Sequence, residues 1–284
     1  MNLRKEVSHR PLNGYGHGVR KPMEILVGDD QAAIIYEDRT VLAIDKPARW
    51  MLAPSHWQNT GRNLMLEVEG QVLMRAPWAQ LRNIKYLRFI HRLDADTTGV
   101  LLGVKSEGAV LPMSKLFETR NVEKSYLAVV EGCPTEDRWT SSEPIGEVPG
   151  KPERMHVDRK NGKPSETDFV VVARDKKRAL IAVYPRTGRT HQIRVHLQAD
   201  RLPIQGDLWY RAEGAALPTG PLALRAVALQ YLDPFMKRRV VIRAKTMDFL
   251  KQFGFASAEE KVEAMLPAIP GRRPPLPDVQ QPKP

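Results

Sequence analysis

The sequence contains almost no cysteine and no long apolar run. Cys133 is the single cysteine among 284 residues, so an internal disulfide and a metal site built from several cysteines are excluded. No apolar segment is long enough to cross a bilayer, and the first residues lack the apolar core of a secretory signal. These absences predict a protein of the reducing cytoplasm that makes no membrane contact.

The chain is rich in positive charge instead. It has 44 lysine and arginine residues against 33 acidic ones, a formal net charge of +11 at pH 7, which favours a polyanionic partner. An anionic membrane surface would attract the same charge, but the sequence has no basic amphipathic helix. With 42% apolar residues, the chain can bury a sizeable core in one large domain or two small ones.

Composition divides the chain into three parts. Residues 1–31 combine glycine, proline and charge, and we expect them to form an N-terminal extension. Residues 32–250 show the apolar patterning of a folded domain, and residues 251–284 are expected to form a C-terminal extension. Its last part, 267–284, holds seven of the 23 prolines and cannot build a core.

Apolar periodicity predicts both strands and helices. Strands are expected at residues 32–36, 41–44, 86–90, 100–104, 122–131, 168–174, 179–184, 222–231 and 239–244. Helices are expected at residues 63–75, 107–119, 190–199, 247–253 and 256–266. Pro112 is expected to begin its helix or to bend it, and residues 190–199 also alternate as a strand would. Residues 135–164, rich in proline, glycine and charge, are interpreted as a connection on the RNA-facing side or at an edge, and their pattern assigns no helix or strand.

Three stretches combine charged or aromatic side chains with apolar flanks. They are FIHRLDADTTGV at 89–100, EKSYLA at 123–128 and TGRTHQIRVHL at 187–197. In the first, Asp94 lies on a polar turn between two apolar segments, which would hold the acid rigidly at a surface. In this order, the three stretches resemble the RluA-type pseudouridine synthases, which are RNA-modifying enzymes.

The resemblance covers residues 34–245 and implies a fold, a reaction and a partner. The fold would be α+β, a mostly antiparallel mixed β-sheet flanked by helices, with a central basic catalytic cleft in residues 32–250. The reaction would convert specific uridines of ribosomal or transfer RNA to pseudouridine. Because nothing is oxidised and no group leaves the enzyme, no cofactor and no metal are expected. We expect a monomer that binds RNA through the cleft and the tails.

Asp94 is the candidate for the catalytic carboxylate. A nucleophile needs its lone pair and a base needs a vacant proton site, so both roles require the ionised acid. Attack on the sugar, attack on the ring and removal of a ribose proton to give a glycal all stay open. An aspartate in a polar turn usually caps the turn, and only the resemblance places catalysis ahead of that role. Asp96 is assigned to the turn.

Arg194 and Tyr126 complete the catalytic group that the resemblance implies. Arg194 would provide the counter-charge that keeps Asp94 ionised on burial. The alternative, a surface helix arginine, fits poorly with its apolar neighbours Ile193 and Val195. Tyr126 would stack on the target uracil, because a flat ring holds a base in any rotation. The alternative is an ordinary strand tyrosine with its ring in the core.

Five further residues are expected to contact RNA. They are His91, Arg92, Lys124, Arg189 and His191. Arg92 would fill the space from which the uridine is flipped, an extraction that costs roughly a few kcal/mol of unstacking. Its alternative role, almost as well supported, is a salt bridge that holds the turn. The histidines, His196 included, fit structural hydrogen bonds or contacts with backbone phosphates better than acid–base or metal chemistry.

The chain departs from the family pattern at three positions, Arg49, Ala53 and Arg225, and has Asp45 where the family allows asparagine or a close variant. The family usually has asparagine or a close variant, then glycine and histidine, where this chain has Asp45, Arg49 and Ala53. Relatives often have Leu-His-Ala where this chain has Arg225 between leucine and alanine, and we expect Arg225 to alter an RNA contact. None of these departures removes a catalytic group.

Two other functions compete with the enzyme. A non-catalytic RNA-binding or RNA-chaperone protein could retain the same fold, but binding alone has no need of the Asp94 carboxylate. An unrelated basic protein could use its charge at a membrane, but three ordered motifs and the missing amphipathic helix disfavour it. The sequence therefore predicts an RNA pseudouridine synthase.

Overall fold

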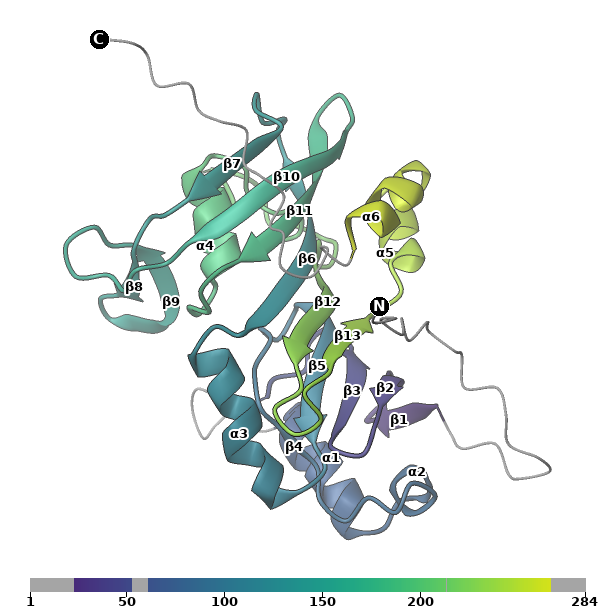
Figure 1. The fold of residues 1–284 in the computed structure, drawn as a ribbon. Coiled ribbons are helices and arrows are strands. Elements are labelled where there is room, and N and C mark those ends of the chain that lie inside the picture. The colour runs from purple at the N-terminus through teal and green to yellow at the C-terminus, as the bar shows by residue number, and fades with distance from the viewer. Residues whose placement is uncertain (1–22, 53–60, 213, 267–284) are drawn as a thin grey trace, which may run out of the picture.

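A mixed sheet of eleven strands organises the described residues. The computed structural model describes residues 23–52, 61–212 and 214–266. Residues 1–22, Ala53 and the proline-rich tail lie outside the described residues. Figure 1 shows the sheet running through the whole molecule, with helices beside it. None of the helices in the described ranges is long and apolar enough to cross a membrane.

The strand order places β5, β12 and β6 in the middle of the sheet. The order is β1-β2-β3-β5-β12-β6-β11-β10-β7, with β4 paired to β5 and β13 paired to β12. All of these pairs are antiparallel except β5 with β12. The strands are β1 (Glu24–Val27), β2 (Asp30–Glu37), β3 (Val41–Lys46), β4 (Arg88–Phe89), β5 (Thr98–Val104), β6 (Val122–Glu131), β7 (Arg138–Ser141), β10 (Thr167–Arg174), β11 (Arg178–Pro185), β12 (Leu224–Leu232) and β13 (Arg239–Arg243). The predicted α+β class with a mostly antiparallel mixed sheet is confirmed.

Helices lie beside the sheet along its length. They are α1 (Leu64–Leu73), α2 (Pro77–Gln80), α3 (Glu107–Glu118), α4 (Gln192–Ala199), α5 (Met247–Gln252) and α6 (Glu259–Met265), with a 3-10 turn η1 (Ala256–Ala258). Helix α1 packs near β1 and β4, α3 packs on β5, and α4 contacts β10 and β11. Figure 1 shows α4 on one side of β11 and the α5–α6 segment on the other.

The structure decides the ambiguous segment at 190–199 in favour of a helix. All six residues from Gln192 to Leu197 are buried, so alternation along the segment does not separate a core face from a solvent face. Buried Gln192 and His196 satisfy their polar groups with hydrogen bonds to Thr167 on β10. Pro112 lies inside α3, which begins at Glu107, so the proposal that Pro112 starts this helix is wrong.

Two of the three large apolar clusters lie in the two halves of the molecule, and the third packs α3 against β3, β5, β12 and β13. One joins β1–β3 with α1 and α2, and the other joins β6, β10 and β11 with α4, α5 and α6. Tyr126, on the central strand β6, packs against both clusters. It therefore lies where the two halves of the sheet meet.

Residues 135–164 contain strands that the sequence did not predict. Strand β7 pairs with β10 at the edge of the sheet, and β8 (Ile145–Val148) and β9 (Lys151–Val157) form a separate two-stranded hairpin. A small cluster of Ile145, Val195 and Tyr210, with Met155 packed against it, holds the hairpin to the main domain. Charged residues, prolines and glycines weaken the apolar alternation of these strands in the sequence. The apolar residues that cover the hairpin, Val195 and Tyr210, lie far away in the sequence.

Both predicted extensions contain ordered elements in their described parts. Strand β1 pairs with β2 and buries Ile25 and Val27 completely, although residues 1–31 were assigned to the N-terminal extension. Helix α6 buries Val262 in the core, although it belongs to residues 251–284. The domain division at residues 32 and 250 stays a prediction.

The turn that carries Asp94 is fixed at both ends. The Thr97 N–H donates to the Asp94 carbonyl at 3.2 Å, and Thr98 and Gly99 pair in parallel with Arg225 and Ala226 of β12. Gly99 has φ = +109°, and a Cβ there would collide with the Ala226 carbonyl. Only glycine allows β5 to start this close to β12.

We expect Gly99→Ala to lower the free energy of unfolding by about 3 kcal/mol or more, because it adds both a backbone clash and an unfavourable φ. Gly108→Ala is the matched control, since Gly108 lies in α3 and a Cβ added there would have no neighbouring atom within 4 Å. That control should be neutral or stabilise the protein by at most about 1 kcal/mol. Urea denaturation of both variants tests this, and equal stabilities would contradict it.

Candidate active site

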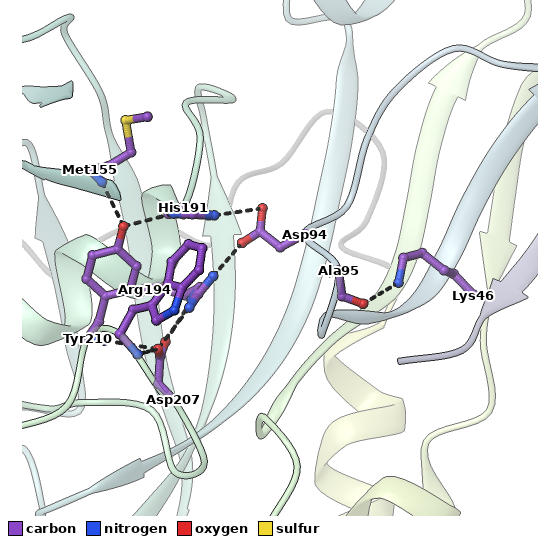
Figure 2. Close-up of polar contacts among 9 residues, drawn as sticks. Lys46, Asp94, Ala95, Met155, His191, Arg194, Asp207 and Tyr210 are labelled. Atoms are coloured by element: carbon purple, nitrogen blue, oxygen red, sulfur yellow. Dashed lines mark hydrogen bonds and ion pairs between the residues drawn. The ribbon is translucent and has the colours of Figure 1, made fainter. Parts of the chain in front are cut away.

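Asp94 and Arg194 come from opposite halves of the fold and meet between them. Asp94 lies on the turn between β4 and β5, and Arg194 lies on α4. The Arg194 Nη1 atom is 3.3 Å from the Asp94 Oδ2 atom, and the two side chains are 7% and 17% exposed. Figure 2 shows the carboxylate pointing towards the guanidinium. The contact predicted from the sequence is therefore present.

Arg194 is anchored by a second acid that the sequence analysis missed. Arg194 Nε and Nη2 donate to the two carboxylate oxygens of Asp207, at 2.7 and 2.9 Å, and the Asp207 side chain is fully buried. Burial favours the neutral form of each group, but their mutual hydrogen bonds and charges outweigh it. The pKa of Asp207 is therefore lowered and the pKa of Arg194 is raised.

The loop that carries Asp207 completes the support of the guanidinium. The N–H groups of Trp209 and Tyr210 donate to Asp207 Oδ1 at 2.9 and 3.0 Å. The Tyr210 ring lies 4.8 Å from the Arg194 guanidinium carbon, a cation–π contact. Nothing in the local sequence pattern marks Asp207 as different from an ordinary loop aspartate, because its partner lies thirteen residues earlier, on α4.

His191 links Asp94 to the same loop. Its Nδ1 is 2.8 Å from the Tyr210 hydroxyl, which accepts from the Met155 N–H at 2.8 Å, and its Nε2 is 3.9 Å from Asp94 Oδ1 (Figure 2). The hydroxyl proton of Tyr210 is free to donate to Nδ1, which leaves the Nε2–H facing Asp94. Burial lowers the pKa of His191 in spite of the Asp94 charge, so the neutral ring fits this arrangement.

A buried glutamine holds the loop before α4 in place. The Gln192 amide oxygen accepts from the Thr187 hydroxyl at 2.6 Å and from the Arg189 N–H at 3.0 Å. The amide nitrogen donates to Thr167 at 2.9 Å. These bonds hold His191 at φ = +55°, a conformation that non-glycine residues adopt only when their surroundings enforce it.

Tyr126 is placed between the two halves by its strand partners. On β6 it pairs with Val183 of β11 and with Ala226 of β12. Burial and the nearby Asp94 charge both raise the pKa of Tyr126, so its hydroxyl stays protonated at neutral pH. A partly buried aromatic ring therefore stands close to the carboxylate.

All of the site residues predicted from the sequence line one cavity. These residues are His91, Arg92, Asp94, Lys124, Tyr126, Arg189, His191 and Arg194. They come from the β4–β5 turn, from β6 and from the loop and helix at 187–194. The three sequence stretches, far apart along the chain, therefore build one site.

The basic residues of the cavity differ in how firmly they are held. Lys124 donates to the Thr187 carbonyl at 2.9 Å, and burial, with the charge of Arg120, lowers its pKa to about 8. Arg189 Nε donates to the Pro164 carbonyl at 3.1 Å. Arg92 is exposed, and within the described ranges its side chain makes no hydrogen bond or salt bridge. A turn-holding salt bridge of Arg92 is therefore absent among these residues.

His91 has a structural environment. Its Nε2 accepts from the Leu102 N–H at 2.9 Å, and its ring stacks on Phe117 with centroids 4.7 Å apart. Burial, followed by the charge of Lys124, lowers the pKa of His91 to about 3. His91 is therefore neutral at physiological pH and adds no positive charge to the cavity wall.

Lys46 holds the backbone of the Asp94 turn. It is completely buried, and its Nζ donates to the carbonyls of Ala95 and Pro47 at 2.7 and 2.8 Å (Figure 2). Burial lowers its pKa to about 7, against the opposing charges of Asp96 and Asp94. No sequence pattern marks Lys46, because only the fold brings it next to the turn.

Arg225 is engaged inside the protein. Its Nη1 donates to Asp45 Oδ1 at 3.0 Å and to Thr98 Oγ1 at 3.2 Å, and its Nε donates to the Lys245 carbonyl at 3.0 Å. Its side chain is 11% exposed. The expectation that Arg225 alters an RNA contact finds no support in this geometry, since the guanidinium is occupied by internal acceptors.

Comparisons with known proteins identify the family of this chain. The family model for RNA pseudouridylate synthase matches residues 40–199, which include all three stretches. Ribosomal large subunit pseudouridine synthase D of Nitrosomonas europaea is 36% identical over 179 residues, 62% of this chain and 49% of the relative. The dual-specificity RNA pseudouridine synthase RluA of Vibrio parahaemolyticus is 30% identical over 214 residues, 72% of this chain and 80% of the relative.

A solved structure is similar over most of the described fold. Human RNA pseudouridylate synthase domain containing 1 matches with a TM-score of 0.60 and 27% sequence identity, over 76% of this chain and 84% of that chain. Against the Nitrosomonas relative, the chain spans about half the length of the relative.

We expect the two acids that contact Arg194 to differ in their effect on stability. Asp207→Asn removes the charge that neutralises a buried guanidinium and should lower the free energy of unfolding by about 3 kcal/mol. Asp94→Asn removes one longer contact at a partly exposed group and should cost less than about 1 kcal/mol. Chemical denaturation of both variants measures this, and equal losses would show that Asp94 is part of the structural anchor.

The buried amine of Lys46 predicts a pH dependence of stability. Its pKa is about 7 in the fold against an ordinary value of 10.5, so between these values the unfolded chain binds more protons and the folded state gains stability as pH rises. The stability of the wild type relative to Lys46→Met should increase from pH 7 to pH 10, by up to about 1.4 kcal/mol per pH unit. Urea denaturation across this range measures the difference, and a constant difference would mean that Lys46 keeps its proton.

Proposed function

The chain belongs to the RluA-type family of RNA pseudouridine synthases, and on this premise we propose that it isomerises specific uridines of ribosomal or transfer RNA through the carboxylate of Asp94. The observation that carries the proposal is the arrangement at Arg194. Its charge is matched by the buried Asp207 through two short hydrogen bonds, at 2.7 and 2.9 Å, so Asp94 is left with a single 3.3 Å contact.

This arrangement suits a reactive acid. The reaction breaks the bond from the ribose anomeric carbon to a uracil nitrogen and joins the same carbon to a ring carbon. An ionised carboxylate is needed for attack on the sugar or the ring, or for removal of a ribose proton. Among the described residues the Asp94 Oδ1 atom accepts no hydrogen bond; it lies 3.9 Å from His191 Nε2, and Asp94 lines a cavity. It is therefore available to the nucleoside.

Tyr126 provides the surface on which the detached base turns. Its ring lines the cavity beside Asp94, and its strand neighbours on β11 and β12 fix its position. An aromatic face binds a uracil in any rotation about the axis normal to the ring. The neutral hydroxyl places no second negative charge near Asp94.

Arg92, Lys124, Arg189 and His191 form the RNA-facing wall of the cavity in this proposal. The exposed guanidinium of Arg92 enters the space left by the flipped uridine, since a planar cation stacks on bases and also binds phosphate. Arg189 lies in the loop at 187–189 and Lys124 lies next to it, and both contact the phosphate backbone of the RNA. His91 contributes packing beneath this wall, because its ring nitrogen is used by the Leu102 N–H.

The substrate class and the assembly follow from the same site. The relatives named above act on ribosomal large subunit RNA or on more than one RNA, and we infer a ribosomal or transfer RNA substrate for this chain, encountered in the cytoplasm. One chain supplies Asp94, Tyr126 and Arg194 to the cavity, which supports a monomeric enzyme.

Asp94→Asn should abolish pseudouridine formation and leave RNA affinity within about threefold, because a neutral amide is neither a nucleophile nor a base of useful strength. The test is a pseudouridine map of ribosomal and transfer RNA from cells with and without the protein. A site that is lost without the protein, restored by the wild type and not restored by Asp94→Asn supports the proposal.

Two different results would contradict two different parts of the proposal. Restoration by Asp94→Asn would remove Asp94 from catalysis but keep the enzyme. No lost site at all, with the protein expressed and bound to RNA, would favour a non-catalytic RNA-binding protein of the same fold.

A further inference from the structure

An exposed indole lies next to the catalytic group but outside its cavity. Trp209 is 39% exposed, and its side chain is absent from the cavity lining. The His191 ring meets it edge-on, with centroids 5.2 Å apart, and the Arg194 guanidinium carbon lies 5.5 Å from its ring centroid. The His191 ring, which lines the cavity, therefore separates Trp209 from the place proposed for the target base.

A second arginine reaches the same indole from the β8–β9 hairpin. The guanidinium carbon of Arg154 lies 5.6 Å from the Trp209 ring centroid. Within the parts of the chain that the structure describes, the Arg154 side chain makes no hydrogen bond or salt bridge. Its N–H donors are therefore available to a phosphate or a base.

The position of this pair is fixed by the fold. The Met155 N–H donates to the Tyr210 hydroxyl at 2.8 Å, which ties β9 to the loop beside the indole. The Trp209 N–H donates to Asp207 Oδ1 at 2.9 Å. Arg154 thus precedes a residue, Met155, that is hydrogen-bonded into the site, and Trp209 is hydrogen-bonded into it through its own N–H. These backbone bonds hold the two side chains together at the edge of the cavity.

We propose that Trp209 and Arg154 form a stacking platform for a nucleotide that neighbours the target uridine in the RNA. This inference rests on the proposed function. An aromatic ring binds a base or a guanidinium through its face, and the Arg154 guanidinium, which lies over the indole, can in turn stack on the base and neutralise its phosphate. Because the platform lies outside the cavity, it grips the flanking strand while the target base occupies the site beside Tyr126.

A purely structural role of Trp209 makes a different prediction. If the indole served only to pack on Arg194, its loss would disturb the catalytic group and lower kcat. A platform that binds RNA equally before and during reaction affects KM and leaves kcat unchanged. The split between the two kinetic constants therefore separates the two roles.

The experiment measures initial rates of pseudouridine formation against concentration of ribosomal and transfer RNA purified from cells that lack this protein. Trp209→Ala should raise KM roughly tenfold or more, the effect of losing one stacked base, with kcat within about twofold. Trp209→Phe keeps an aromatic face and should stay within about threefold of the wild type. Leu208→Ala is the matched control, because Leu208 is exposed, aliphatic and adjacent, and it should change neither constant.

Arg154→Ala tests the phosphate part of the platform. It should raise KM and reduce the slope of log KM against log salt by about one, as expected for one lost phosphate contact. An unchanged KM in Trp209→Ala, or a fall in kcat alone, would overturn the platform.

A fluorescence titration keeps the proposal testable if Trp209→Ala does not fold. RNA binding to Asp94→Asn should quench indole emission, and part of this quenching should disappear in Asp94→Asn/Trp209→Phe. Identical quenching in the two proteins would overturn the platform. If the wild type forms no pseudouridine on any RNA, the proposed function fails instead, and the titration still reports on stacking.

Discussion

The buried guanidinium of Arg194 is the constraint on which the site depends. A cation that is only 7% exposed costs several kcal/mol to bury unless acids accompany it. Asp207 provides that partner from a loop, and Asp94 provides a second contact from the opposite half of the sheet. The Arg194 charge therefore binds the Asp207 loop to α4 and also orients Asp94 on the turn before β5. The two halves of the fold meet where this ion pair forms.

The turn that presents Asp94 needs support that does not involve the carboxylate itself. Lys46 donates to the Ala95 carbonyl, and Gly99 lets β5 approach β12 closely enough to form the parallel pairing. Both contacts act on the backbone, so the side chain of Asp94 stays available to the cavity. Burial lowers the pKa of this lysine to about 7, so near neutral pH it carries less positive charge beside Asp94 than an exposed lysine would.

The sequence was informative where a pattern is local and uninformative where partners are distant. Periodicity placed most strands and helices, and three motifs predicted a cavity that contains Asp94, Tyr126 and Arg194. The β8–β9 hairpin was missed because its apolar residues alternate weakly and pack on α4 and Tyr210. Asp207 was missed because its role comes only from a contact across thirteen residues and two elements. Long-range pairs of this kind leave no periodic trace.

The departure from the family pattern at position 225 has an internal partner in the fold. Position 225 has arginine where relatives often have histidine, and position 45 has aspartate where the family has asparagine or a close variant. The structure joins these two side chains as an ion pair with two hydrogen bonds, one of them 3.0 Å long, between β3 and β12. Either change alone would leave a charge that is largely buried, whereas together they satisfy each other. The pair lies one residue before Lys46 and one before Ala226, so it adds to the support of the turn that carries Asp94.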